Sequence, residues 1–170
     1  FLIATGRSIN KERMKDQYVV LRAMAFLMLH RGEFKDIPAL QYRGDIDDFL
    51  ARFMVYVNDN APEKLIVDYE NLFIRCMQIS YDLLGENGFR FSGNGIRRPI
   101  NMPLFEALSY LFSFVPEKID YTWASRLILD IESVKEEFDD SRYFSGNIDS
   151  TTSVSFRFDR MDKIINRIQL

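Results

Sequence analysis

The sequence predicts an all-α protein, an irregular bundle of about six helices. Three observations predict this class. Apolar residues recur every three to four positions along most of the chain, which is the period of a helix with one buried face. Short runs of Gly, Pro, Asn and Asp separate these segments, and no pair of segments alternates apolar and polar residues as paired strands do. A length of 170 residues fits one helical domain over residues 1–170.

The first three helices have recognisable ends. The first is predicted over 16–30 and is apolar almost all round, so we expect it near the centre of the bundle. Asp45 is predicted to cap the second helix, because its side chain can accept from a free backbone N–H. The third follows a break at Pro62 and ends at Gly85. Spacings of three and four predict its buried stripe: Leu65, Tyr69, Leu72, Cys76, Ile79 and Leu83.

Three more helices are predicted after an irregular loop or short hairpin over 86–100. Asn101 is expected to cap the fourth helix, and Pro116 to end it. Asp120 or Thr122 begins the fifth. After a polar segment, the last helix is predicted to bury Val154, Phe158, Met161, Ile165 and Ile168.

The composition excludes several kinds of active site. One cysteine cannot form a disulfide within the chain, and one cysteine with one histidine cannot build a Cys/His zinc site or a nuclease centre that needs several histidines. Cys76 lies in a helical stripe and should be an inert core thiol. His30 ends the first helix, where a cation suits the dipole, so we expect a capping or interface role. We therefore predict no catalytic residue and no metal site. Most of the 15 phenylalanines fall on helical stripes and are assigned to packing, with an aromatic cage or base-stacking platform as the alternative; those on stripes are Phe26, Phe49, Phe53, Phe73, Phe105, Phe112, Phe138 and Phe158.

Three acidic pairs could in principle bind Mg²⁺ or transfer protons. Neighbouring carboxylates on a helix point about 100° apart, so a pair alone does not make a site. We interpret these pairs as solvated helix faces: Asp47–Asp48, Glu136–Glu137 and Asp139–Asp140.

Two basic segments are candidate phosphate or nucleic-acid contacts. The first segment offers Arg97, Arg98 and Asn101 as candidates, because the two arginines stand just before the helix that Asn101 is expected to cap, an arrangement that favours an anion. Arg157 and Arg160 follow a run of Ser and Thr hydroxyls. The alternatives are that the arginines pair with acidic neighbours and that the hydroxyls form caps and turns. The net charge of −3 provides no general basic field for nucleic acid.

No membrane segment is expected. The longest apolar run, 18–29, is broken by Arg22 and is shorter than the roughly 20 residues needed to cross a bilayer. With no targeting segment visible, we expect the cytoplasm. The abrupt apolar start at Phe1 indicates a piece of a longer protein.

Three short motifs, in order along nearly the whole chain, carry a family resemblance. They are Thr5-Gly6-Arg7 with Arg13-Met14-Lys15-Asp16-Gln17, then Arg97-Arg98-Pro99-Ile100-Asn101 with Leu104-Phe105-Glu106-Ala107, and the Ser/Thr-rich turn before a basic helix. Together they resemble the helical part of domain-of-unknown-function family 262 (DUF262).

This resemblance implies a parent protein like the GmrSD-type modification-dependent restriction enzymes of bacteria and related phage-defence proteins. There, an N-terminal ParB/sulfiredoxin-like domain with a D-G-Q-Q-R motif handles nucleotide, with NTP and Mg²⁺ as its cofactors, and a C-terminal HNH domain often cuts DNA. This chain contains neither motif. We expect no cofactor and no catalytic residue within it.

Two functions follow. The first is a non-catalytic helical module of a nucleotide-dependent restriction or phage-defence protein, which packs on the missing N-terminal domain of the same chain and contacts DNA through its arginines. The alternative is a free-standing protein-interaction or regulatory α-helical domain without nucleic-acid binding. An autonomous enzyme fits least well, and a homodimer is left open. The first function predicts an exposed apolar patch near the N-terminal residues.

Overall fold

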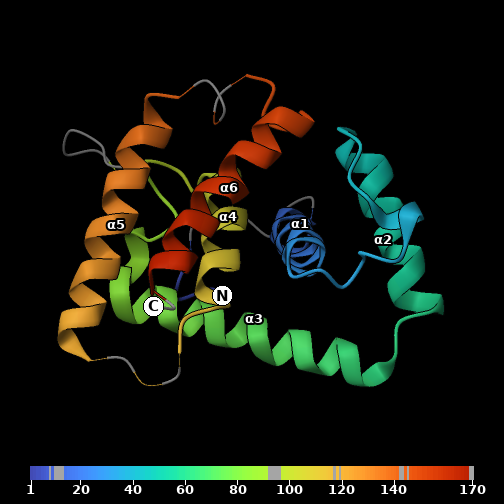
Figure 1. Cartoon of the computed structure of the whole chain (residues 1–170), viewed down its shortest axis with the longest axis horizontal. Helices are drawn as coiled ribbons and strands as arrows, with labels where there is room; N and C mark the ends of the chain where they lie inside the picture. The colour runs from blue at the N-terminus through green and yellow to red at the C-terminus, as the bar shows by residue number, and fades with distance from the viewer. Residues whose placement is uncertain are drawn as a thin grey trace.

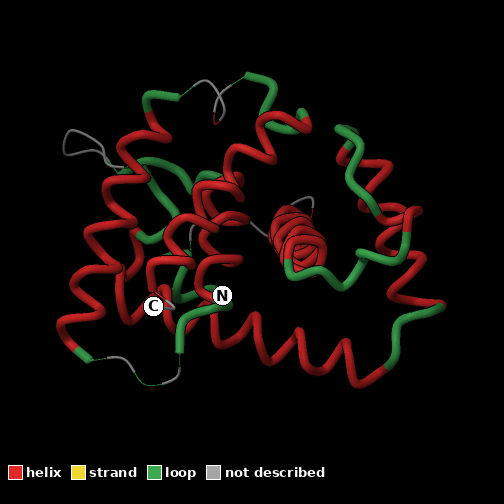
Figure 2. The backbone as a smooth tube through the Cα atoms, in the orientation of Figure 1, coloured by secondary structure: helices red, strands yellow, loops and turns green. Residues whose placement is uncertain are grey.

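The computed structural model describes residues 1–7, 9, 14–91, 97–116, 118, 120–141, 144 and 146–168. This part of the chain contains six α-helices and no strand, so the predicted all-α class is confirmed (Figure 2). The helices are α1 (Lys15–His30), α2 (Ile46–Asp59), α3 (Glu63–Leu84), α4 (Met102–Phe112), α5 (Tyr121–Asp139) and α6 (Thr151–Ile168). Two short 3₁₀ helices accompany them, η2 (Pro38–Leu40) and η3 (Gly85–Asn87).

The helices divide into a closely packed group and one outlying helix. α4 packs against α1, α3 and α6, and α5 covers α6 and α3 from outside. Figure 1 shows α1 almost end-on, with α4, α5 and α6 to one side of it, α2 to the other and α3 running below. α2 packs against α1 and η2.

α4 is the most deeply buried helix of the described residues. Every residue from Pro103 to Phe112 is buried, because α4 is apolar on nearly all sides and has neighbours on each. α1 was expected at the centre, but residues along one side of it, including Val20 and Met24, are only partly buried. The difference arises because α1 has α4 on one side and only the thinly packed α2 on the other.

The predicted N-caps are confirmed. The backbone N–H groups of Asp48, Leu104 and Trp123 donate to the side chains of Asp45, Asn101 and Asp120 at 3.0, 2.9 and 2.8 Å. Asp120 rather than Thr122 therefore caps α5. α3 ends at Gly85, as predicted, with a positive φ of 62° that other residues adopt only at a cost.

Two helix ends differ from the sequence prediction. α4 ends at Phe112, and a turn fills the residues before Pro116. α6 begins at Thr151, inside the segment expected to be irregular. Its hydroxyl-bearing residues form the first turn, where the Ser153 backbone N–H donates to Ser150 Oγ at 3.1 Å. Part of the predicted loop, 92–96, lies outside the described residues.

Aromatic rings fill the core. All eight phenylalanines assigned to helical stripes are buried: Phe26, Phe49, Phe53, Phe73, Phe105, Phe112, Phe138 and Phe158. Phe158 is a meeting point, with its ring centroid 5.7 Å from that of Phe26 and 5.3 Å from that of Tyr110. The packing role predicted for these rings is confirmed. Within the described residues, no helix has the length and apolar character to cross a membrane.

Candidate interaction surface

An open hollow of about 980 Å³ lies between α1, α2 and α3, and we call it the α1–α2–α3 groove. Its walls are mostly apolar. Residues that line it include Phe1, Met14, Val20, Leu21, Met24, Met28, Phe53, Met54, Val57, Ile66 and Tyr69. The prediction of an exposed apolar region near the N-terminal residues thus has a structural counterpart here.

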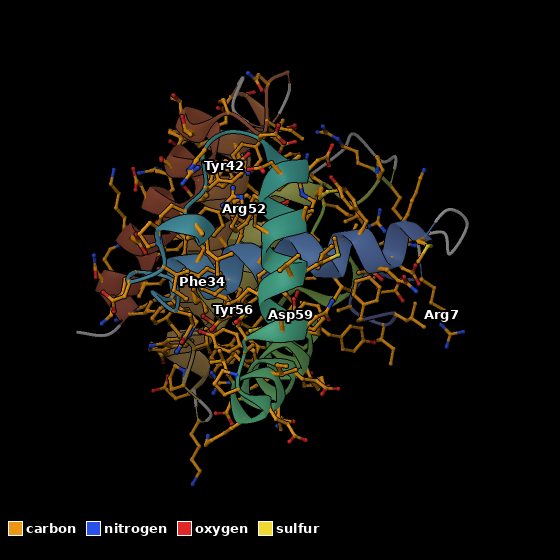
Figure 3. All side chains as sticks on the ribbon, turned by 90° about the vertical axis from the view of Figure 1, so that its right-hand side faces the viewer. Arg7, Phe34, Tyr42, Arg52, Tyr56 and Asp59 are labelled. Carbon is orange, nitrogen blue, oxygen red and sulfur yellow. The ribbon has the colours of Figure 1, made fainter. Side chains whose placement is uncertain are left out.

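The groove exists because α2 is thinly packed. Of its 14 residues only Phe49, Leu50 and Phe53 are buried. Figure 3 looks onto α2, which crosses in front of α1 and leaves side chains on either side of the crossing. Met54 and Ile66 face the hollow and are 44% and 39% exposed, so α2 and α3 each present a solvent-accessible apolar side chain to it.

The opposite side of α2 is anchored to the loop that precedes it. Tyr56 packs edge-on against Phe34, with centroids 5.5 Å apart. The Arg52 guanidinium donates to Asp48 at 2.7 Å and to the backbone carbonyl of Ala39. Phe34, Arg52 and Tyr56 are labelled in Figure 3. A second, smaller hollow of about 640 Å³ lies beside Arg52 and Tyr56.

Three of the four predicted phosphate-binding arginines form surface ion pairs. Arg97 pairs with Glu86 at 2.9 Å, Arg98 with Asp139, and Arg160 with Glu137. The Arg98 guanidinium also lies over the ring of Phe91. Pairing with acidic neighbours, the alternative stated for these arginines, is therefore observed. Asn101, the fifth candidate, uses its side-chain oxygen as the cap of α4.

Arg157 is different, because its side chain is completely buried. Its guanidinium donates to Glu106 at 3.1 Å and to the backbone carbonyl of Ile148. A phosphate at the protein surface cannot reach it in this arrangement. Arg157 therefore belongs to the core rather than to a basic surface patch.

Glu106 holds two arginines at the centre of the molecule. Arg22 of α1 donates to Glu106 Oε1 at 2.6 Å, and Arg157 of α6 donates to Oε2. Arg22 also donates to Asp149 at 2.6 Å, and Tyr42 donates to the Asp149 backbone carbonyl. Burial raises the pKa of the Glu106 carboxyl, while the positive charges of Arg22 and Arg157 oppose that rise. The network joins α1, α4 and α6 through charge.

The sequence contained a signal for this network that our prediction did not use. Arg22 is the single break in the apolar run 18–29, and Glu106 stands among apolar residues of the fourth helix. A charged residue at a buried helical position needs a partner of opposite charge. On that ground, Arg22 and Glu106 could have been predicted to pair. That Arg157 and Asp149 join them depends on the fold.

The prediction that His30 acts as a cation at the end of the first helix is wrong. Its ring stacks on Phe158 with centroids 3.6 Å apart, and Nε2 is buried with no hydrogen-bond partner among the described residues. Burial, helped by the charge of Arg157, lowers the pKa of His30 to about 4. With this pKa the ring is neutral at pH 7, and it stacks on Phe158 instead of acting as a cation at the helix end.

The single cysteine lies in the core, as predicted. Cys76 is completely buried, and burial raises the pKa of its thiol to about 12, so it is not a reactive nucleophile. Among the described residues, no three His, Cys, Asp or Glu side chains gather as metal ligands. The acidic pairs contribute Asp48, Glu137 and Asp139 to surface ion pairs.

Two segments that carry the family resemblance lie together. Arg90 donates to the backbone carbonyls of Thr5 and Arg98, which ties the N-terminal turn to the segment before α4. Gly6 has a φ of +58°, and a Cβ there would lie 1.9 Å from the Arg97 guanidinium. A larger residue here would adopt a strained backbone conformation and would have to displace the Arg97 side chain.

Comparison with known proteins found no matching family model, no curated relative and no matching solved structure. The family resemblance remains a prediction based on the three motifs.

Proposed function

We propose that this chain is a non-catalytic helical module that packs on another protein domain through the α1–α2–α3 groove. The observation that carries the proposal is the groove itself, an open and mostly apolar hollow with Met54 and Ile66 exposed in its walls. Covering such a surface removes apolar area from water, which stabilises a complex by about 25 cal/mol per Å² before the costs of association.

The family resemblance suggests the partner. It is the D-G-Q-Q-R domain of a bacterial restriction or phage-defence protein, which would bind NTP and Mg²⁺ and precede this module in one cytoplasmic chain. The rival is a free-standing regulatory bundle that uses the same groove for a different protein. Both functions need the groove, and they differ in what occupies it.

Site-specific photo-crosslinking in the native host tests the proposal. A photoreactive residue replaces Met54 in the groove, and the matched control replaces Val55, which is 58% exposed on the other side of α2. We expect an intramolecular crosslink from Met54 to the D-G-Q-Q-R domain of the same chain, identified by mass spectrometry of the digested protein. An adduct with an unrelated protein supports the regulatory alternative, and one between two copies indicates a homodimer. Equal labelling from both positions rejects the groove as the docking surface.

DNA contact has less support. Arg97, Arg98 and Arg160 are accessible, but each is already paired with a carboxylate. Binding to labelled duplex DNA at several salt concentrations tests the contact, because each neutralised phosphate contributes to the slope of log K against log salt. A slope indistinguishable from zero removes DNA from the proposal and leaves protein docking.

A further inference from the structure

We infer that the α1–α2–α3 groove receives an amphipathic helix whose polar face carries Lys and Arg. This inference rests on the proposed function, because it names the class of partner that the groove accepts. Three properties of the groove support it: its length, its methionine content and the charge around it.

The length of the groove suits a helix. Along α1 its lining extends from Lys15 to Met28. At 1.5 Å per residue this wall is about 20 Å long, which matches about four turns of a bound helix. Such a helix would present apolar anchors at i, i+3, i+4 and i+7. The described part of the chain has no sheet edge to which an extended peptide could add a strand.

Methionines are concentrated in the groove. Of the seven in the chain, four line it: Met14, Met24, Met28 and Met54. The methionine side chain is unbranched and polarizable, so it adapts to differently shaped apolar partners. A wall of this kind accepts the leucine, isoleucine or phenylalanine anchors of a helix without demanding one fixed shape.

Among the described residues, the charges around the groove are mainly negative. Asp16 and Asp47 line it, against one lysine, Lys15. On α3, Glu63 and Glu70 are exposed and lie three residues before and four residues after Ile66, on the same face of the helix. No ion pair involves any of these four carboxylates within the described residues. Basic side chains along the polar face of a bound helix would complement them.

Peptide binding to the 170-residue chain tests the inference. The probe is a fluorescent peptide of about 18 residues with a leucine stripe and lysines on its remaining face. Its controls are the same stripe with glutamates and a scrambled lysine peptide with no stripe. We expect the lysine peptide to bind at least tenfold more tightly than either control, as measured by fluorescence anisotropy.

Variants locate the binding site. Ile66→Asp places a charge in the groove and should weaken binding of the lysine peptide at least tenfold. Ile74→Asp is its matched control, because Ile74 is equally an isoleucine of α3, is 59% exposed and does not line the groove. The double variant Asp47→Asn with Glu70→Gln should weaken the lysine peptide several-fold and leave the glutamate peptide unchanged or tighter.

The outcomes separate this inference from the proposed function. Equal binding of the lysine and glutamate peptides overturns the charge preference, and equal binding of the scrambled peptide overturns the helical anchor pattern. If Ile66→Asp and Ile74→Asp weaken binding of the lysine peptide equally, the groove is rejected as its binding site. If no peptide binds while Met54 still crosslinks to a partner domain, the groove remains a docking surface but its occupant is not a basic helix.

Discussion

The two sides of α1 are built differently. On one side α4 buries every residue from Pro103 to Phe112, and the charges of Arg22, Glu106 and Arg157 meet inside the core. On the other side α2 buries three residues and leaves apolar side chains exposed. The comparison teaches that burial and buried charge are concentrated in the α1–α4–α6 core, whereas the α2 side leaves the α1–α2–α3 groove open to solvent.

The largest effect should come from breaking the buried charge network. Glu106→Ala leaves Arg22 and Arg157 as buried cations without their shared partner. We expect a loss of about 3–5 kcal/mol in the free energy of unfolding, measured by urea denaturation.

A compensated variant separates charge from packing. Arg22→Met, Glu106→Leu and Arg157→Met together remove all three charges and keep apolar volume, so this triple variant should be more stable than Glu106→Ala alone. If the triple variant is less stable than Glu106→Ala, the ion pairs of the network stabilise the core beyond neutralising each other's buried charge.

The second-largest effect should be a pH dependence of the free energy of unfolding that arises from His30. Since burial lowers the pKa of His30 to about 4, the unfolded chain, with a pKa near 6.5, takes up a proton first as the pH falls. The contribution of His30 is complete above pH 6.5 and is lost as the pH falls towards 4. This loss amounts to about 2 kcal/mol between pH 7 and pH 5.

The variant His30→Phe provides the control, because it keeps a ring on Phe158 and removes the titration. Its free energy of unfolding should fall less than that of the wild type between pH 7 and pH 5. An identical fall in both proteins would show that other groups, such as Glu106, account for the pH dependence.

Matched cap variants compare the two sides directly. Asn101→Ala and Asp45→Ala each remove one N-cap hydrogen bond, worth about 1 kcal/mol. On α4 the loss should lower global stability, since the core cannot form without that helix. On α2 it should mainly accelerate local amide hydrogen exchange, with a smaller change in global stability. Similar global losses would mean that α2 unfolds together with the core.

The smallest effect should come from a surface pair. Asp48→Ala removes the ion pair with Arg52 at 2.7 Å, in which the Asp48 side chain is 53% exposed. We expect a loss of at most about 1 kcal/mol, reduced further by salt. A loss approaching that of Glu106→Ala would contradict the contrast between the two sides.

Much of the fold could be predicted because its signals are local. Asp45, Asn101 and Gly85 mark helix ends through their own side chain or backbone freedom. The start of α6 was missed because Ser150 and its hydroxyl-bearing neighbours are equally common in turns and at N-caps. How deeply α4 is buried depends on which helices surround it, and the apolar pattern within one helix does not specify those neighbours.

The groove could not be predicted in the same way. Ile66 lies outside the buried stripe predicted for the third helix, but the pattern within one helix does not specify that it comes together with Met24 and Met54. Their partial exposure results from how little α2 packs on α1 and α3. The arginines near Asn101 were found from the sequence, but their pairing with Glu86 and Asp139 depends on contacts between distant segments.

Hydrogen exchange with and without the lysine peptide tests the central claim most directly. The account predicts that saturating peptide slows amide exchange in α2, in the first half of α3 and along α1 from Lys15 to Met28. Exchange in α5 and α6 should stay unchanged, because these helices do not line the groove. Slowed exchange confined to α5 and α6, or no change in α2 at saturation, would contradict the claim that this chain binds a partner helix in the α1–α2–α3 groove.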